Sequence, residues 1–232
     1  MASALRHSER LNGKIGLVIS GLNQASLDFW RHPRIAELYP ELLFNIHCVI
    51  RASVPLMETA RRAALDLAVS DAVAAQVAAY LERHIPEEMH HDEWLLDDLR
   101  VLGKDPAEVL KRVPPVAAAA LVGSQYYWTL HAHPVAIMAY LAVLEGNPPS
   151  APFLEEVIAT TGLPREAFRT YLKHALLDPH HGAELNAALD AMPLTEQHSA
   201  LLGVNAFQTV GALQAMFREL AGQPAAQAAG VR

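Results

Sequence analysis

The chain has little of several features that mark common protein classes. A single cysteine among 232 residues excludes a disulfide framework and any zinc site built from thiolates. Lys and Arg number 18 against 25 Asp and Glu, so the basic excess typical of nucleic-acid binding is missing. The longest apolar run, residues 135–144, has about half of the roughly 20 residues that a membrane helix needs. We therefore expect neither nucleic acid nor membrane as a partner. The N-terminal residues are not those of a signal peptide, which favours a cytoplasmic protein.

Signals for β-structure are missing as well. The sequence shows no sustained period-two alternation and no Asn-Gly or Asp-Gly hairpin signal. Apolar residues make up 52% of the chain, which predicts a folded protein rather than a disordered one. Helical periodicity runs through nearly all of it. We expect helices near residues 12–30, 39–66, 71–101, 105–112, 115–146, 151–162, 165–177, 179–191 and 195–221.

The connections between these helices are short, and no Pro/Gly/Ser-rich linker divides the chain. The sequence therefore predicts an all-α fold, a single compact bundle of about seven to nine helices over residues 1–221, followed by a disordered tail at 222–232. Prolines 55, 86, 134 and 179 lie inside helical patterns, and each should kink or interrupt its helix.

The predicted helix over residues 71–101 has ionisable side chains where its buried face should be apolar. Steps of four and three residues define one stripe of an α-helix. Its members are Val77, Leu81, His84, Glu88, His91 and Leu95. The ends of the stripe are apolar and its centre is not. Since an unpaired buried charge is costly, such groups are normally paired or bound to a metal.

Residues 167–188 repeat this arrangement. The same steps give Ala167, Tyr171, His174, Asp178, His181 and Leu185. Both centres consist of His, three residues, a carboxylate, two residues and a second His. A carboxylate and a histidine three positions apart lie on adjacent turns of one helix face. Pairs of this kind from two helices, with further carboxylates, form the di-iron and di-manganese sites of helical bundles.

A third element is Glu145, which ends an apolar helix. The C-terminal end of a helix carries partial negative charge, so a carboxylate is unfavourable there unless a cation binds. Imidazoles and carboxylates without thiolates suit iron or manganese better than structural zinc. A lone histidine on an apolar face is usually a hydrogen-bonded core residue. Six or seven such positions in two matching stripes favour a metal site.

The register of the first motif has an alternative. Glu87 with His90 forms the same pair one step earlier in the chain. Glu88 with His91 is preferred, because only this register continues to His84.

With these motifs the sequence resembles the haem-oxygenase-like di-iron oxidases and oxygenases, also called the iron-containing redox enzyme family. These proteins share a seven-helix fold with thiaminase II and pyrroloquinoline-quinone synthase. The resemblance covers roughly residues 28–190 and includes the 54-residue interval from His91 to Glu145. Its motifs are residues 84–91 (HIPEEMHH), 94–99 (WLLDDL), 133–146 and 174–181 (HALLDPHH).

The resemblance implies a ligand set, position by position. The implied ligands are Glu88, His91, Glu145, His174, Asp178 and His181. Some members have a glutamate seven residues before the first ligand histidine, where this chain has His84, and others use the carboxylate three residues before it, here Glu88. Glu88 is therefore preferred, with His84 as a further ligand or a partner of the ligands. Ligation by His84 would bring a single iron or a mixed Mn/Fe site into play.

The resemblance also implies a function. It indicates a non-haem di-iron oxidoreductase with two iron ions and dioxygen as co-substrate. The expected substrate is a small amino acid or fatty acid, that is, an amine or carboxylic acid. The expected reactions are desaturation, oxidative decarboxylation, N-oxygenation or C–C cleavage, in specialised metabolism. An external electron donor and a homodimer are left open as partners.

Two kinds of residue are candidates for binding the substrate. Arg51 interrupts an apolar stretch and Lys173 adjoins the second motif, so either could bind a carboxylate. A salt-bridged surface arginine is the ordinary alternative for Arg51. Tyr127 belongs to an aromatic group upstream of Glu145 that could line a pocket or simply pack in the core. The group comprises Tyr126, Tyr127, Trp128, His131 and His133.

Two other classes of protein stay open. One is a metal-free enzyme of the same fold, like thiaminase II or pyrroloquinoline-quinone synthase, in which Cys48 is the only candidate nucleophile of the thiaminase type. Cys48 has no adjacent base, and a lone buried cysteine is usually inert. The other is a non-enzymatic helical protein that binds metal. An apolar stripe of the last helix could pack within the domain or across a dimer: Leu201, Val204, Phe207, Val210, Leu213 and Phe217.

Overall fold

Helices account for the regular secondary structure of the part of the chain that the structure describes. This computed structural model describes residues 5–146 and 148–223. The helices are α1 (His7–Trp30), α2 (Ile35–Ile50), α3 (Ser53–Leu67), α4 (Ala72–Glu88), α5 (His91–Val101), α6 (Pro106–Lys111), α7 (Val116–His131), α8 (Ala136–Leu144), α9 (Ala151–Thr161), the 3₁₀ helix η1 (Arg165–Phe168), α10 (Arg169–Ala191) and α11 (Glu196–Leu220). The all-α fold class is confirmed. Most of the predicted tail, residues 224–232, lies outside the described residues.

Capping residues set several helix boundaries where the sequence indicates them. The Asp71 carboxylate accepts two backbone N–H groups at the start of α4, and the Thr195 hydroxyl accepts the backbone N–H of His198 at the start of α11. The Ser150 hydroxyl does the same for α9. Gly103, with φ of +75°, follows the end of α5. Such caps satisfy backbone donors that a helix end leaves free.

Three of the predicted long helices are each two helices. The range 39–66 covers most of α2 and α3, which together extend from Ile35 to Leu67. The range 71–101 contains α4 and α5, and the range 115–146 contains α7 and α8. Pro134 lies in the connection between α7 and α8, as expected of a residue that interrupts a helix.

The predicted separation of helices at residues 177 and 179 is wrong, because α10 continues through Pro179. Pro86 likewise lies inside α4. A proline inside a helix costs about 3 kcal/mol. On both sides of Pro179, α10 is held by packing against α1, α4, α5 and α8.

The first helix begins five residues earlier than the sequence indicates. The backbone N–H and hydroxyl of Ser8 donate to the carboxylate of Asp190 in α10, at 2.8 and 2.9 Å. This contact between distant parts of the chain holds the first turn of α1 against α10. The helix start is also capped locally, because the Glu9 carboxylate accepts the backbone N–H of Arg6 at 2.9 Å.

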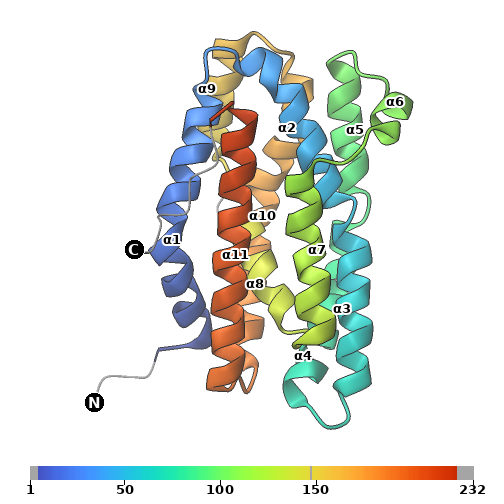
Figure 1. The fold of residues 1–232 in the computed structure, drawn as a ribbon, viewed down its shortest axis with the longest axis vertical. Helices are drawn as coiled ribbons and strands as arrows, with labels where there is room; N and C mark the ends of the chain where they lie inside the picture. Colours follow the sequence, from blue (N-terminus) through green and yellow to red (C-terminus); the bar gives the residue numbers. More distant parts are fainter. Residues whose placement is uncertain (1–4, 147, 224–232) are drawn as a thin grey trace, which may run out of the picture.

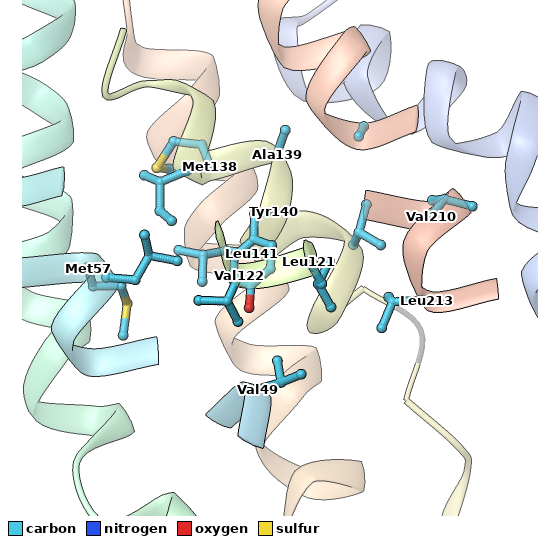
Figure 2. Packing of buried hydrophobic residues seen from close by; sticks show 14 of the residues in the cluster. Val49, Met57, Leu121, Val122, Met138, Ala139, Tyr140, Leu141, Val210 and Leu213 are labelled. Carbon is cyan, nitrogen blue, oxygen red and sulfur yellow. The ribbon is translucent and has the colours of Figure 1, made fainter. Parts of the chain in front are cut away.

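A short apolar helix forms the centre of the bundle. Figure 1 shows α1 beside α11 along the long axis, with α8 enclosed by α7, α10 and α11. Residues 135–141 are all buried. Tyr140 and Leu141 of α8 lie near Leu121 of α7 in Figure 2, which also shows Val210 of α11 among the buried residues. This packing carries Glu145, at the end of α8, into the interior.

Within the described residues, α11 is the one helix whose length and composition would allow it to cross a membrane. It packs against α1, α7 and α8, as a core helix of a folded domain does. The residues of its predicted apolar stripe differ in burial: Val210 and Leu213 are buried, whereas Val204 and Phe207 are exposed.

Candidate metal centre

The two histidine–carboxylate motifs face each other in the interior of the bundle. The rings of His84 and His181 lie 5.1 Å apart, and those of His91 and His174 lie 5.0 Å apart. The first histidine of each motif thus meets the last histidine of the other, which means that the two segments run antiparallel. Both pairs meet edge to face, at 83° and 86°.

The first motif is built differently from the single helical stripe predicted for it. Helix α4 ends at Glu88, Met89 is extended, and α5 begins at His91. His90, between them, has φ of +69°, a conformation unfavourable for a residue with a side chain. The helix is interrupted here, and His91 still contacts Glu88 at 3.1 Å. The second motif lies on one helix, α10, as predicted.

Three carboxylates join the histidines. Glu145 Oε1 lies 3.2 Å from His84 Nε2, and Asp178 Oδ1 lies 2.9 Å from His174 Nδ1. Glu88, of the first motif, also contacts the second motif, because its Oε1 is 3.4 Å from His181 Nδ1. The structure therefore brings together all seven residues proposed as ligands, His84 and Glu88 included.

Several of these buried polar atoms lack a hydrogen-bond partner among the described residues. They are His84 Nδ1, Glu88 Oε1, Glu145 Oε2 and His181 Nδ1. An unsatisfied buried polar group costs about 1–3 kcal/mol, and more when charged. Four such atoms in one cluster are what a site for a bound cation would provide. The donors are imidazole and carboxylate without thiolate, which fits iron or manganese.

The electrostatics of the cluster show acids and bases competing for protons. Burial raises the pKa of Glu145, against the effect of His84. Burial also favours the neutral form of Glu88, but hydrogen bonding from His91 lowers its pKa overall. The pKa values of His84 and His174 are raised, because neighbouring carboxylates outweigh the effect of burial. A bound cation would stabilise the charged carboxylates and the neutral imidazoles together.

Aromatic rings fix the orientation of two of the imidazoles. Tyr80 stacks on His84 with ring centroids 5.2 Å apart, and Trp94 lies 4.0 Å from His91. The ammonium of Lys173 lies 3.6 Å from the centroid of Trp94, a cation–π contact. Lys173 thus contacts Trp94, and its role in binding a substrate carboxylate stays a prediction.

The alternative register of the first motif is not the one that the fold uses. His90 is exposed and pairs with Glu93 at 2.9 Å. Glu87, however, lies beside the cluster, 3.6 Å from His84 Nδ1 and 3.6 Å from His181 Nε2. The sequence pattern indicates Glu87 only as the partner of His90 in the alternative register, not as a neighbour of His84 and His181. Its spacing of three residues from His84 is the signal that could have indicated it.

Two cavities reach the cluster. A largely apolar cavity of about 400 Å³ is bounded by α1, α2, α5, α8, α9, α10 and α11, with His174 and Asp178 in its wall. Its apolar lining includes Trp30, Val49, Val143, Phe153 and Phe217. A second cavity of about 560 Å³, more polar, is lined by Glu145 and Asp178 with Asn12 and Asn186. Asp178 thus lies in the wall of both.

The candidate substrate residues Arg51 and Tyr127 lie elsewhere. Neither is among the lining residues of these two cavities. Arg51 is half-buried at the end of α2. Tyr127 is 59% exposed and packs against Trp128 and His131. A role in binding substrate stays a prediction for both.

A second group of side chains able to bind a metal, Asp71, His133 and His198, lies at one end of the bundle. Most of its possible ligand atoms already take part in hydrogen bonds. Asp71 Oδ1 accepts two N–H groups of α4, and its Oδ2 lies 3.1 Å from His133 Nε2. Backbone N–H groups of Val135 and Thr195 donate to Nδ1 of His133 and of His198, at 3.1 and 3.3 Å. This group caps and connects helices.

Comparison with protein families identifies the class of the chain. Residues 55–212 match the model of a family described as iron-containing redox enzymes. The chain belongs to this family. The match covers more than half of the sequence and includes every residue of the two motifs and Glu145. The iron-containing redox enzymes are oxidoreductases in general, and the donor set of the cluster agrees with iron.

Solved structures show the same fold. A domain of unknown function with a haem-oxygenase-like fold from Shewanella denitrificans has a TM-score of 0.77 at 16% identity, over 90% of each chain. A CADD-like protein of unknown function from Nostoc punctiforme has a TM-score of 0.67 at 19% identity, over 91% of this chain and 97% of that one. A TenA homologue from Pseudomonas syringae has a TM-score of 0.63 at 14% identity, over 90% and 92%. The haem-oxygenase-like fold is confirmed. A comparison with curated protein sequences gives no match.

Proposed function

We propose that this chain is a non-haem iron oxidase or oxygenase that uses dioxygen to oxidise a small carboxylic acid or amine with an apolar body. The main support is the cluster of seven histidines and carboxylates at the wall of an apolar cavity. Four of its buried atoms have no hydrogen-bond partner among the described residues. Membership in the family of iron-containing redox enzymes supports iron as the metal.

Iron ligation would involve Glu88, His91, Glu145, His174, Asp178 and His181, with His84 as a further ligand. The number of carboxylates would allow two ions, as in the di-iron sites of helical bundles. Bound iron would supply the redox chemistry and the positions at which dioxygen binds. The protein supplies the geometry and a site from which water is excluded.

The apolar cavity supports a substrate with a hydrocarbon portion. Its volume of about 400 Å³ lies within the usual range for small-molecule sites. His174 and Asp178 lie in its wall, so a ligand in the cavity would have one end at the metal centre. This arrangement suits a fatty acid or an apolar amino acid.

Two lining residues would orient the polar groups of such a substrate. Trp30 and Thr170 are buried, and the indole N–H and the hydroxyl lack partners among the described residues. Burying a donor without a partner is costly, so a ligand acceptor would gain from either group. Trp30→Phe keeps a ring in this wall and removes the N–H. We expect it to weaken substrate binding about tenfold without changing iron content.

The metal-free alternative receives little support from the structure. Cys48 is buried, and burial raises the pKa of its thiol. A reactive cysteine needs the opposite, a stabilised thiolate. A non-enzymatic metal protein would account for the cluster but leaves the adjoining apolar cavity without a role.

The test is dioxygen consumption by protein loaded anaerobically with ferrous iron. We expect iron to bind stoichiometrically, and dioxygen uptake to rise when the matching acid or amine is added, with an oxidised product in mass spectra. Bound iron without dioxygen uptake across a panel of fatty acids, amino acids and amines would support the non-enzymatic alternative instead.

A further inference from the structure

Glu87 is a carboxylate on the solvent side of the cluster. Its side chain is 42% exposed, whereas the side chains of His84 and His181 are 2% and 5% exposed. Its Oε2 lies 3.6 Å from His84 Nδ1 and 3.6 Å from His181 Nε2. A set of donor atoms from these three residues lies within 4.8 Å of one another, close enough to share one ion.

The two imidazoles separate Glu87 from the buried carboxylates. His84 turns Nδ1 toward Glu87 and Nε2 toward Glu145, at 3.2 Å. His181 turns Nε2 toward Glu87 and Nδ1 toward Glu88, at 3.4 Å. Glu87, His84 Nδ1 and His181 Nε2 form an outer donor set. Glu88, Glu145, His84 Nε2 and His181 Nδ1 form an inner donor set, one imidazole ring deeper.

The outer donor set has a free donor atom. His84 Nδ1 is buried and has no hydrogen-bond partner among the described residues. When His84 donates from Nε2–H to Glu145, the neutral ring carries its lone pair on Nδ1, which lies beside Glu87. This lone pair is available to a metal.

Glu87 has no evident structural role that would explain this position. At 3.6 Å its contacts with the two imidazoles are too long for hydrogen bonds, so Glu87 does not hold the rings in place. Within the described residues, no Lys or Arg forms an ion pair with it.

We propose that the outer donor set is an entry site, at which a divalent cation is first captured from solvent before it reaches the inner donor set. The proposal rests on the proposed function, in which the buried residues hold iron. An exposed carboxylate attracts a hydrated cation and replaces part of its water shell. The two imidazoles lie between the outer and inner sets, and each has a nitrogen on both sides. The apolar cavity is a poor route for a hydrated ion, and the polar cavity lined by Glu145 is the competing route.

Rapid mixing of metal-free protein with cobalt(II), an air-stable substitute for ferrous iron, tests the proposal. The visible absorbance of bound cobalt reports uptake, and release to excess chelator gives the exit rate. We expect Glu87→Gln to slow both entry and exit about tenfold, because the ion passes this residue in both directions. The dissociation constant should stay within about twofold and the final stoichiometry should not change, because the ion does not remain at Glu87.

Glu82→Gln is the matched control, since Glu82 is an exposed residue of the same helix. It should leave both rates unchanged. Glu87→Asp, which keeps the charge, should restore most of the entry rate. Entry and exit rates in Glu87→Gln equal to those of the control would overturn the entry site and favour the polar cavity. A weaker affinity with an unchanged entry rate would overturn it too, because Glu87 would then be a resident ligand. If the wild-type protein bound no cobalt stoichiometrically, the proposed metal centre would fail as well.

Discussion

Two clusters of histidines and carboxylates in this molecule differ in what their atoms already bind. In the cluster of Asp71, His133 and His198, the atoms that face backbone N–H groups accept hydrogen bonds from them. In the buried centre, carboxylates and imidazoles contact mainly one another, and atoms such as His84 Nδ1 and Glu145 Oε2 have no partner among the described residues. The proximity of ligand-type residues is therefore not enough to indicate a metal site. Buried ligand atoms that have no hydrogen-bond partner are a more specific sign of a metal site.

The largest expected difference between the clusters is in iron affinity. Asp178→Asn and His174→Ala each remove a donor from the buried centre and should lower iron affinity on the order of 100-fold. His133→Ala should leave it unchanged. Iron content after equilibration with a competing chelator measures this. An equal loss in His133→Ala would mean that the wrong cluster has been assigned to the metal.

The second difference is in stability. If iron binds only the folded protein, a concentration one hundred times the dissociation constant should add about 2.7 kcal/mol to the free energy of unfolding. We also expect residues 174–185 to gain protection in hydrogen exchange, since Pro179 weakens this part of α10 and ligation would order it. Equal protection with and without iron would contradict this expectation. Asp178→Asn should show neither effect.

Asp98 is a fully buried carboxylate outside both clusters, and it combines features of the two: one of its oxygens has a hydrogen-bond partner among the described residues and the other has none. One oxygen accepts the N–H of Thr170 at 2.9 Å, and the other has no hydrogen-bond partner among the described residues. Burial raises the pKa of Asp98 to about 6 from an ordinary value of 3.8. The folded protein therefore keeps this proton at pH values where the unfolded chain has lost it. The contribution of Asp98 to stability is full below about pH 4 and falls as the pH rises to about 6.

Asp98→Asn removes this titration and keeps an acceptor for Thr170. Relative to wild type, the variant should become more stable between pH 4 and pH 7, by about 2–3 kcal/mol at most. Denaturant unfolding at several pH values measures the difference. A difference that does not vary with pH would show that the carboxyl is not perturbed.

The smallest expected effect belongs to the capping cluster. Asp71→Ala removes the N-cap of α4 and the contact with His133, which should cost about 1 kcal/mol of stability. Iron content should not change. If Asp71→Ala lost iron without losing stability, this cluster would be a metal site rather than a cap.

Much of the centre was predictable because ionisable side chains stand at sequence positions where a buried helix face should be apolar. His174, Asp178 and His181 occupy the face of α10 whose other members, such as Leu185, are buried. The sequence pattern does not show whether the residues of one stripe belong to one continuous helix or to two helices. Glu88 and His91 belong to two helices, because the backbone at Met89 and His90 leaves the helical path. That turn follows from tertiary packing rather than from a local signal.

Other features depend on contacts between distant parts of the chain. The first turn of α1 packs against α10 because Ser8 reaches Asp190. Glu87 lies beside the centre because α10 brings His181 to it. The shape of the apolar cavity likewise results from seven helices, so no single segment of the sequence describes it. The local sequence pattern therefore indicates which residues form the centre. The cavity and the exposed carboxylate beside it depend on how the helices pack.

The most direct test of the central claim is anomalous X-ray diffraction at the iron edge from crystals of the iron-loaded protein. We predict an anomalous peak in the bundle interior, between α4, α5, α8 and α10, among the proposed ligands Glu88, His91, Glu145, His174, Asp178 and His181. A peak at Asp71, His133 and His198, or no peak in the interior, would contradict it.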